Sequence, residues 1–204
     1  MLEFQNVSFS YAQSDGGGAV QNINLRIQPG EAVLICGKSG CGKTTLTRLI
    51  NGLIPHYHEG GLSGQVLLCN RSIAQMPLYE LAKQTGSVFQ NPRSQFFTTD
   101  TTSELVFSLE NLGMTKEEIL RRIWQVTHEF NISGLLGRNI FSLSGGEKQK
   151  IACASATALT PDIIVLDEPS SNLDTAAIEE LRQALLMWKK QGKTLIIAEH
   201  RLHY

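Results

Sequence analysis

Residues 37–44 read Gly-Lys-Ser-Gly-Cys-Gly-Lys-Thr. Glycines stand at the first and sixth positions, and Lys43 and Thr44 follow, which is the spacing of a phosphate-binding loop. Glycine lets the backbone N–H groups turn toward phosphate oxygens, and a following helix offers its positive N-terminus. The sequence therefore predicts a nucleotide site in which Lys43 reaches the β- and γ-phosphates and the Thr44 hydroxyl binds Mg²⁺.

The flanks of this loop supply the context that a chance glycine-rich turn would lack. Residues 32–36 form a continuous apolar run, which is typical of a strand buried on both faces. Residues 44–53 place Leu46, Leu49, Ile50 and Leu53 on one side of an expected helix. A strand, a loop and a helix in this order favour the phosphate-site interpretation.

A second motif occupies residues 163–168, where the run Ile-Ile-Val-Leu ends in Asp167 and Glu168. Ligands collect at the carboxyl ends of parallel strands, so Asp167 is expected near the metal bound at Thr44. Glu168 would polarise a water molecule toward the γ-phosphate. By itself, an apolar run followed by two acids is more often a strand entering a solvated turn; the phosphate loop favours the site.

A third motif is Leu-Ser-Gly-Gly-Glu at residues 143–147, which precedes a helical stretch. Ser144 and Glu147 fit a capping box, an ordinary way to begin a helix. Ser144 with Gly145 and Gly146 would also form a helix start that is ready to bind an anion. Both interpretations stand on these residues alone.

The periodicity of apolar residues predicts the α/β class. Alternation at residues 2–9 and 23–27 indicates an N-terminal antiparallel β-layer, joined by a flexible connection at 14–18. Further strands are expected at residues 66–69, 87–89, 163–166 and 194–198. Their alternation with helices predicts a mostly parallel sheet of the P-loop NTPase type.

The middle of the chain is expected to be an inserted helical subdomain. Thr115 and Glu118 form a capping box, and the apolar stripe that follows, with Trp124 beside it, is interpreted as internal packing. A later helix is expected to begin at Asp174 and to end at Gly192. We expect one domain, with a core at residues 1–91 and 160–204 and the subdomain at about 92–159.

Composition narrows the class further. The 204 residues are 42% hydrophobic and 18% charged, with a formal net charge of −1, so no global basic field indicates nucleic acid. No apolar run has the length of a membrane span, and residues 1–11 lack a signal-peptide pattern. The four cysteines show no CxxC pairing, which favours a reduced, cytosolic compartment and a buried apolar role for each.

The ordered set of motifs resembles the ABC family of ATP-binding domains over nearly the whole chain. The resemblance implies that Tyr11 stacks on adenine and that Gln90 senses Mg²⁺ and the membrane partner. It also implies that His200 contacts the γ-phosphate and that residues 171–174 cross a dimer interface. The residues that the resemblance places in contact with ATP are Tyr11, Gly37, Lys38, Ser39, Gly40, Cys41, Gly42, Lys43, Thr44, Thr45, Ser144, Gly145, Gly146, Glu147 and Asp174. Glu168, His200 and Gln90 are the implied catalytic residues, and Thr44, Gln90 and Asp167 the implied metal ligands.

Within the family, the chain looks like the ATPases of energy-coupling-factor importers for vitamins or transition-metal ions. The segments that carry this finer resemblance are residues 51–55, 88–92, 94–97 and 110–113. Glu147 and Asn172 depart from the family's commoner glutamine and alanine. The resemblance implies a nucleotide-sandwich dimer, with ATP and Mg²⁺ between two such domains, identical or homologous. A membrane subunit would dock near residues 90–97, on the cytoplasmic face of the membrane.

Three alternatives remain beside this interpretation. The chain could be a soluble ABC protein acting on DNA or ribosomes, although it has no long heptads and no basic tract. It could be a non-hydrolysing regulatory module, which the presence of both Glu168 and His200 disfavours. His56 and His58 could bind a metal, but two histidines in a glycine-rich loop are more often solvated. Because the chain stops four residues after His200, we expect an excised domain with weak activity alone.

Overall fold

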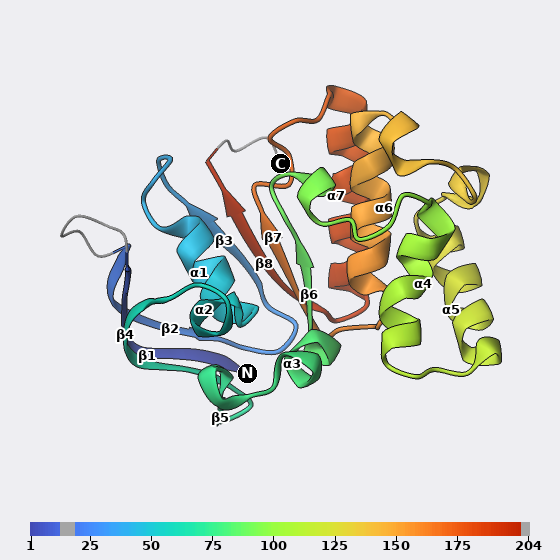
Figure 1. Cartoon of the computed structure of the whole chain (residues 1–204). Helices are drawn as coiled ribbons and strands as arrows, with labels where there is room; N and C mark the ends of the chain where they lie inside the picture. Colours follow the sequence, from blue (N-terminus) through green and yellow to red (C-terminus); the bar gives the residue numbers. More distant parts are fainter. Residues whose placement is uncertain (13–18, 201–204) are drawn as a thin grey trace.

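The structure, a computed structural model, describes residues 1–12 and 19–200, so the expected connection at 14–18 lies outside it (Figure 1). The strands in chain order are β1 Leu2–Tyr11, β2 Val20–Ile27, β3 Ala32–Cys36, β4 Gly60–Leu68, β5 Arg71–Ser72, β6 Thr85–Val88, β7 Ile163–Asp167 and β8 Thr194–Glu199. The α-helices are α1 Lys43–Ile50, α2 Leu53–His56, α3 Leu78–Gln84, α4 Thr101–Asn111, α5 Lys116–Glu129, α6 Gly145–Thr157 and α7 Thr175–Lys190. Short 3₁₀ turns lie at Ile73–Gln75, Pro92–Ser94, Ser133–Leu135 and Ile140–Ser142.

The strands form two sheets, as the alternating patterns predict. One is antiparallel, with the order β2-β1-β4-β5, and the other is parallel, with the order β3-β8-β7-β6. Helix α1 lies on the side of the antiparallel layer, whereas α4 to α7 lie on the other side of the parallel sheet (Figure 1). The predicted α/β class and the N-terminal antiparallel layer are therefore confirmed.

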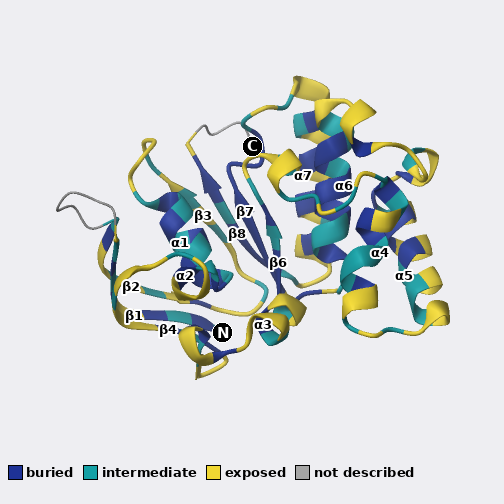
Figure 2. Ribbon diagram, in the orientation of Figure 1, coloured by how far each residue is buried: buried dark blue, intermediate teal, exposed yellow. Residues whose placement is uncertain are grey.

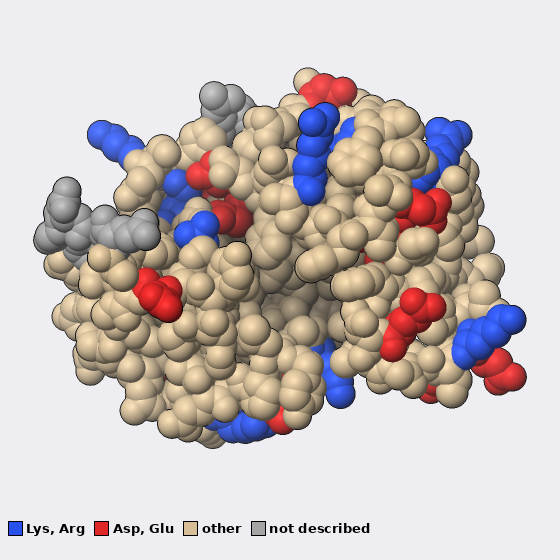
Figure 3. Space-filling model, in the orientation of Figure 1, with Lys and Arg blue, Asp and Glu red and all other residues tan. Residues whose placement is uncertain are grey.

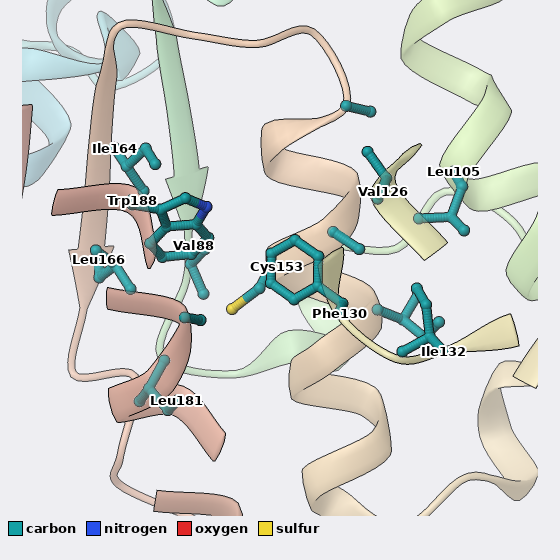
Figure 4. Packing of buried hydrophobic residues seen from close by; sticks show 14 of the residues in the cluster. Val88, Leu105, Val126, Phe130, Ile132, Cys153, Ile164, Leu166, Leu181 and Trp188 are labelled. Atoms are coloured by element: carbon teal, nitrogen blue, oxygen red, sulfur yellow. The ribbon is translucent and has the colours of Figure 1, made fainter. Parts of the chain in front are cut away.

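Strand β7 separates two apolar cores. Ile163 and Val165 pack into the core under the antiparallel layer, and Ile164 and Leu166 pack into the helical core. Successive strand residues point to opposite faces, so a strand that is apolar throughout feeds both cores. The dark blue of β7 and β8 in Figure 2 shows this burial, and Figure 4 shows Trp188 and Phe130 filling the helical core.

The helices begin where the sequence predicts. Thr115 and Glu118 form the expected capping box at α5, and Ser144 and Glu147 form one at α6. The Asp174 carboxylate accepts a hydrogen bond from the backbone N–H of Ala177, which caps α7 as expected. Each cap satisfies backbone donors that the first helical turn leaves without partners.

Two predicted elements differ from the structure. Strand β3 is not buried on both faces: it lies at the end of the strand order, beside β8, and Leu34 is 45% exposed. Helix α1 ends at Ile50 rather than at residue 53. Gly52 adopts a φ of +75°, and an added Cβ there would come within 2.4 Å of a Leu81 methyl carbon, so the chain turns before Leu53.

Two burial expectations were wrong. Trp124 is 64% exposed and packs against the His128 ring at 4.6 Å, because it lies beside the buried stripe of α5 rather than within it. Among the cysteines only Cys153 is buried, and burial raises the pKa of its thiol to about 12. The exposed ones, Cys36, Cys41 and Cys69, lie at the end of β3, in the phosphate loop and just after β4.

The two tryptophans make a matched test of this core. Trp188 is 1% exposed, and the centres of its ring and the Phe130 ring are 5.8 Å apart. Trp188→Ala should therefore lower the free energy of unfolding by about 3–5 kcal/mol. Trp124→Ala removes the same side chain from the surface and should change it by less than about 0.5 kcal/mol. Urea unfolding followed by circular dichroism measures both; equal losses would contradict the assignment of the core.

Candidate functional site

The site lies where the parallel strands end. Because β3, β8, β7 and β6 run in the same direction, their carboxyl ends meet at one edge of the sheet. The phosphate loop follows β3, His200 follows β8, and Gln90 follows β6. Asp167 is the last residue of β7, and Glu168 comes directly after it. Parallel pairing therefore brings together side chains that are far apart in the sequence, such as those of Lys43 and His200.

The phosphate loop holds Lys43 in a buried position. Its side chain is 4% exposed, and its Nζ donates hydrogen bonds to the carbonyls of Gly37 at 2.9 Å and Lys38 at 3.2 Å. The same Nζ lies 3.3 Å from Glu168 Oε1. Gly42 adopts a φ of +98°, and a Cβ there would come within 2.4 Å of the Ala19 carbonyl oxygen, so glycine is required. The loop thus curls around an ammonium group at the start of α1.

The crest of the loop faces solvent. Lys38, Ser39, Gly40 and Cys41 are exposed, and the backbone N–H of Cys41 donates to the Lys38 carbonyl at 3.3 Å. Exposed loop residues around a helix N-terminus suit a phosphate chain, whose oxygens accept hydrogen bonds from several donors.

Thr44 and Asp167 provide the oxygen atoms that a divalent cation needs. The Thr44 hydroxyl donates to Asp167 Oδ1 at 3.2 Å, across the gap between α1 and β7. Burial raises the pKa of Asp167, which the Thr44 hydrogen bond and the nearby Lys43 and Arg48 oppose in part. A buried carboxylate beside a hydroxyl oxygen fits the hard-oxygen preference of Mg²⁺. These residues would therefore hold the metal that the sequence implies.

Glu168 lies at the centre of the site. Its carboxylate accepts a hydrogen bond from Gln90 Nε2 at 3.0 Å and lies 3.3 Å from His200 Nδ1, in addition to its contact with Lys43. Its φ is +45°, in the left-handed region that L residues rarely adopt. The backbone N–H of Glu168 donates to the Ala198 carbonyl at 2.8 Å, which holds this turn. Such strain is typical of functional positions.

Tyr11 and Thr45 meet beside the loop. The Tyr11 hydroxyl lies 3.3 Å from Thr45 Oγ1, on the first turn of α1. The structure therefore places the aromatic ring that the sequence assigns to adenine next to the helix that carries the phosphate loop. Its stacking on adenine stays a prediction.

The motif at residues 143–147 lies elsewhere. It begins α6, across the strand ends from the phosphate loop (Figure 1). Its glycines face the segment before α7 and the first turn of that helix: a Cβ on Gly145 would lie 3.6 Å from the Asn172 carbonyl oxygen, and one on Gly146 would lie 2.9 Å from Ala177 Cβ. The expected role of Ser144, Gly145, Gly146 and Glu147 on a nucleotide therefore requires a second chain or domain. Asp174, also expected at that nucleotide, caps α7.

Other residues support the site without any motif in the sequence. Glu199 is fully buried and accepts hydrogen bonds from Ser170 Oγ at 2.6 Å and from the Ser170 backbone N–H at 3.2 Å. This contact ties the turn after Glu168 to the end of β8. Arg48 donates to the Tyr11 hydroxyl at 2.9 Å. The sequence signal for Glu199 was its position as a polar residue at the end of an expected strand. No sequence signal marked Arg48.

His56 and His58 do not form a metal site with their neighbours. Nowhere in residues 1–12 and 19–200 do three His, Cys, Asp or Glu side chains gather in a way that could hold a metal ion. The His56 ring nitrogen Nε2 lies 3.4 Å from the Ile73 carbonyl oxygen, and the His58 ring packs edge-on against Tyr11. Both histidines have local packing roles.

Comparison with known proteins places this geometry in a family. A model of the ABC transporter family matches residues 20–171. A Treponema denticola protein described as an ABC transporter ATP-binding protein is 53% identical over 208 residues, which cover 100% of this chain and 42% of that protein. A second T. denticola protein is 48% identical and is covered to 41%. The chain thus spans about four tenths of the length of these relatives.

Two solved structures share the fold. CbiO1 from Clostridium perfringens, described as part of the ABC transporter complex CbiONQ, superposes with a TM-score of 0.84 at 30% identity. That match covers 98% of this chain and 78% of CbiO1. The cassette MJ0796, a dimer in a post-hydrolysis state with ADP and Pi, superposes with a TM-score of 0.81 at 28% identity, covering 99% of this chain and 89% of MJ0796.

The buried carboxylate of Asp167 gives a prediction about stability. Burial raises the folded-state pKa of this carboxyl group above its unfolded-state value. Its contribution to the free energy of unfolding is therefore present below the unfolded-state pKa and is lost as the pH rises through the folded-state pKa. At neutral pH the charged form is therefore unfavourable in the ligand-free fold. Asp167→Asn should raise the Tm of the ligand-free protein at pH 7 and should abolish its stabilisation by MgATP.

The matched control is Asp162→Asn, at a side chain that is 91% exposed. It should leave both the Tm and the MgATP response unchanged within error. Differential scanning fluorimetry from pH 5 to pH 8 measures both variants. An Asp167→Asn protein that melts at a lower temperature than the wild type would show that the carboxylate stabilises the ligand-free fold.

Proposed function

Because this chain belongs to the ABC transporter family of ATP-binding domains, we propose that it hydrolyses MgATP to drive a membrane importer of the energy-coupling-factor type. The observation that carries the proposal is the meeting of Lys43, Gln90 and His200 on one carboxylate, that of Glu168. Phosphoryl transfer to water uses a cation at the phosphates and a residue that orients the attacking water, and this cluster contains candidates for both.

The contacts of Lys43 suggest how binding prepares the site. In the structure its ammonium group is satisfied by two loop carbonyls and by Glu168. Phosphate oxygens would compete for this ammonium group, because charge-assisted hydrogen bonds to phosphate are strong. Loss of Lys43 as a partner leaves Glu168 to accept a hydrogen bond from water. The nucleotide would thereby convert an internal ion pair into a base that is ready for use.

The other predicted site residues would bind the metal, the γ-phosphate and the base of the nucleotide. Thr44, Asp167 and Gln90 would bind Mg²⁺, which neutralises charge on the β- and γ-phosphate oxygens when bound. His200 would contact the γ-phosphate from the end of β8. Tyr11 would receive the adenine ring, since base and aromatic faces stack favourably.

A second ABC domain is part of the proposal. The start of α6 carries Ser144 and Gly146 on the far side of the strand ends from the phosphate loop, so this chain alone does not close its own site. The dimeric MJ0796 structure, with ADP and Pi, supports closure by a partner. The chemistry at the site is the same whether that partner is an identical or a homologous domain.

The importer assignment rests on segment 90–97 and on the likeness to CbiO1. In the described part of the chain, each helix is too short or too polar to traverse a lipid bilayer. We propose that coupling to transport is made through a membrane subunit. On the face drawn in Figure 3, lysine and arginine side chains are interspersed with acids, which disfavours action on nucleic acid.

Glu168→Gln tests the catalytic role. It keeps the shape of the side chain but removes the base, so the full-length protein should bind MgATP at least as tightly as the wild type. Turnover should fall by about 10²–10⁴-fold. Binding is measured by calorimetry and turnover by phosphate release, with Lys43→Ala as a variant that should lose binding. Wild-type turnover by Glu168→Gln would exclude Glu168 as the base.

Phe97 is the expected anchor for the membrane subunit. It is 76% exposed and stacks on Phe107 at 4.9 Å, whereas Phe96 is partly buried against the helical core. Phe97→Ser should weaken assembly with the membrane subunit by about tenfold or more and leave ATP binding intact. Tyr79→Ser, which changes a 60% exposed ring on α3, is the control. Undiminished copurification of Phe97→Ser with the membrane subunit would refute the anchor.

A further inference from the structure

Arg48 joins the adenine-side ring to the helix of the phosphate loop. Its Nη1 donates a hydrogen bond to the Tyr11 hydroxyl at 2.9 Å, and the same hydroxyl lies 3.3 Å from Thr45 Oγ1. Thr45 and Arg48 are three positions apart on α1, so they lie on the same face of that helix. One phenolic oxygen is therefore held between two side chains on adjacent turns of α1.

The position of Tyr11 in the chain explains why such a tether matters. Tyr11 is the last residue of β1, and its ladder partner is Gly60, the first residue of β4. A ring at the end of a strand gains little orientation from the ladder beyond it. The hydroxyl contacts supply a second fixed point, and that point belongs to the element whose N-terminus carries Lys43 and Thr44.

The groups around the ring are consistent with a defined orientation. The Phe9 ring packs edge-on against Tyr11 at 4.9 Å, and the His58 ring does so at 6.0 Å. The guanidinium carbon of Arg48 lies 5.9 Å from the centre of the Tyr11 ring. Burial and the Arg48 charge both lower the pKa of His58 from its ordinary value.

We propose that Arg48 is a positioning residue, which fixes the Tyr11 ring relative to the phosphate loop and so sets the affinity for the purine base of the nucleotide. The inference deepens the proposed function and rests on it. The distance between the base and the phosphates of ATP is set by the ribose, so an aromatic platform is useful only if it is held at a matching distance from Lys43. Arg48 and Thr45 provide that reference by anchoring the ring to α1.

Arg48 could instead act as one more positive charge near the phosphates, since it also lies close enough to Asp167 to lower that pKa. The two roles differ in which part of the nucleotide they affect. A charge would attract any triphosphate, with or without a base. A positioning residue would affect only ligands that carry the base, and it would act through the Tyr11 hydroxyl.

The experiment compares MgATP with magnesium tripolyphosphate, which has no base, by calorimetry on the full-length protein. The variants are Arg48→Met, Tyr11→Phe, which keeps the ring and removes the hydroxyl, and the double variant. Arg48→Met should weaken MgATP binding about fivefold, the effect of one hydrogen bond, and Tyr11→Phe, which also loses the Thr45 contact, should weaken it at least as much. Both should leave tripolyphosphate binding within about twofold. The double variant should be no weaker than Tyr11→Phe alone, because that variant has already lost the contact that Arg48→Met removes.

Two controls separate this effect from loss of charge or of fold. Arg26→Met removes an exposed arginine that pairs with Glu3 at 3.3 Å, far from α1 in sequence, and should change neither affinity. Arg48→Lys retains the charge and one donor, and should recover part of the MgATP affinity. If Arg48→Met does not fold, Arg48→Lys and Tyr11→Phe decide the question by the same comparison.

Three results would overturn the inference. Equal losses for MgATP and tripolyphosphate in Arg48→Met would make Arg48 a phosphate cation. Losses that multiply in the double variant would show that the two residues act separately. Equal affinity of the wild type for both ligands would show that no base contact exists, while the phosphate site stands. A wild type that binds neither ligand would reject the proposed function itself.

Discussion

The parallel pairing of β7 with β6 and β8 is the constraint on which the rest of this molecule depends. It gives β7 neighbours on both edges, and the two cores cover both of its faces, so its five residues are all buried. A strand so enclosed has no freedom of register, because a slip by one residue would exchange the contents of the two cores. The acids at its end are therefore placed with the accuracy of the core itself. Asp167 meets Thr44, and Glu168 meets Lys43, because β7 cannot move.

That accuracy carries a cost in stability. Asp167 is buried as a carboxylate, Lys43 as an ammonium group, and Glu168 occupies a left-handed backbone conformation. None of these features favours the ligand-free fold, since buried charges lose hydration and positive φ is strained for a residue with a Cβ. The molecule offsets them with apolar burial on either side of the parallel sheet. A site in this state would gain from binding a divalent cation, because the cation would offset the charge of the buried Asp167 carboxylate.

How far the sequence predicts this arrangement depends on whether a feature is local or distant. The phosphate loop, the strand ending in Asp167 and Glu168, and the caps at Thr115, Ser144 and Asp174 are each written in a few consecutive residues, and the structure contains them all. The exposure of β3 was not predictable from its apolar composition, since it depends on which strand lies beside it. Trp124 was misplaced because a neighbour of an apolar stripe differs from a member of it by one helical position. Glu199 and Arg48 were missed because their partners, Ser170 and Tyr11, are 29 and 37 positions away.

The contacts of Glu168 show that sequence motifs do not reveal how the residues of such a site contact one another. The sequence motifs predict a role at the nucleotide for each of their residues, yet in the structure Lys43, Gln90 and His200 all face Glu168. The three groups come from the ends of three elements, α1 and the segments after β6 and β8, so the carboxylate reports on all of them at once. A change in any one contact alters the electrostatic environment of the other two, because the low-dielectric interior strengthens their coupling. The same side chain that would activate water therefore also joins the predicted phosphate loop to the segment that leads toward the expected membrane contact at Phe97. Chemistry and docking would be linked through one carboxylate, with no separate relay between them.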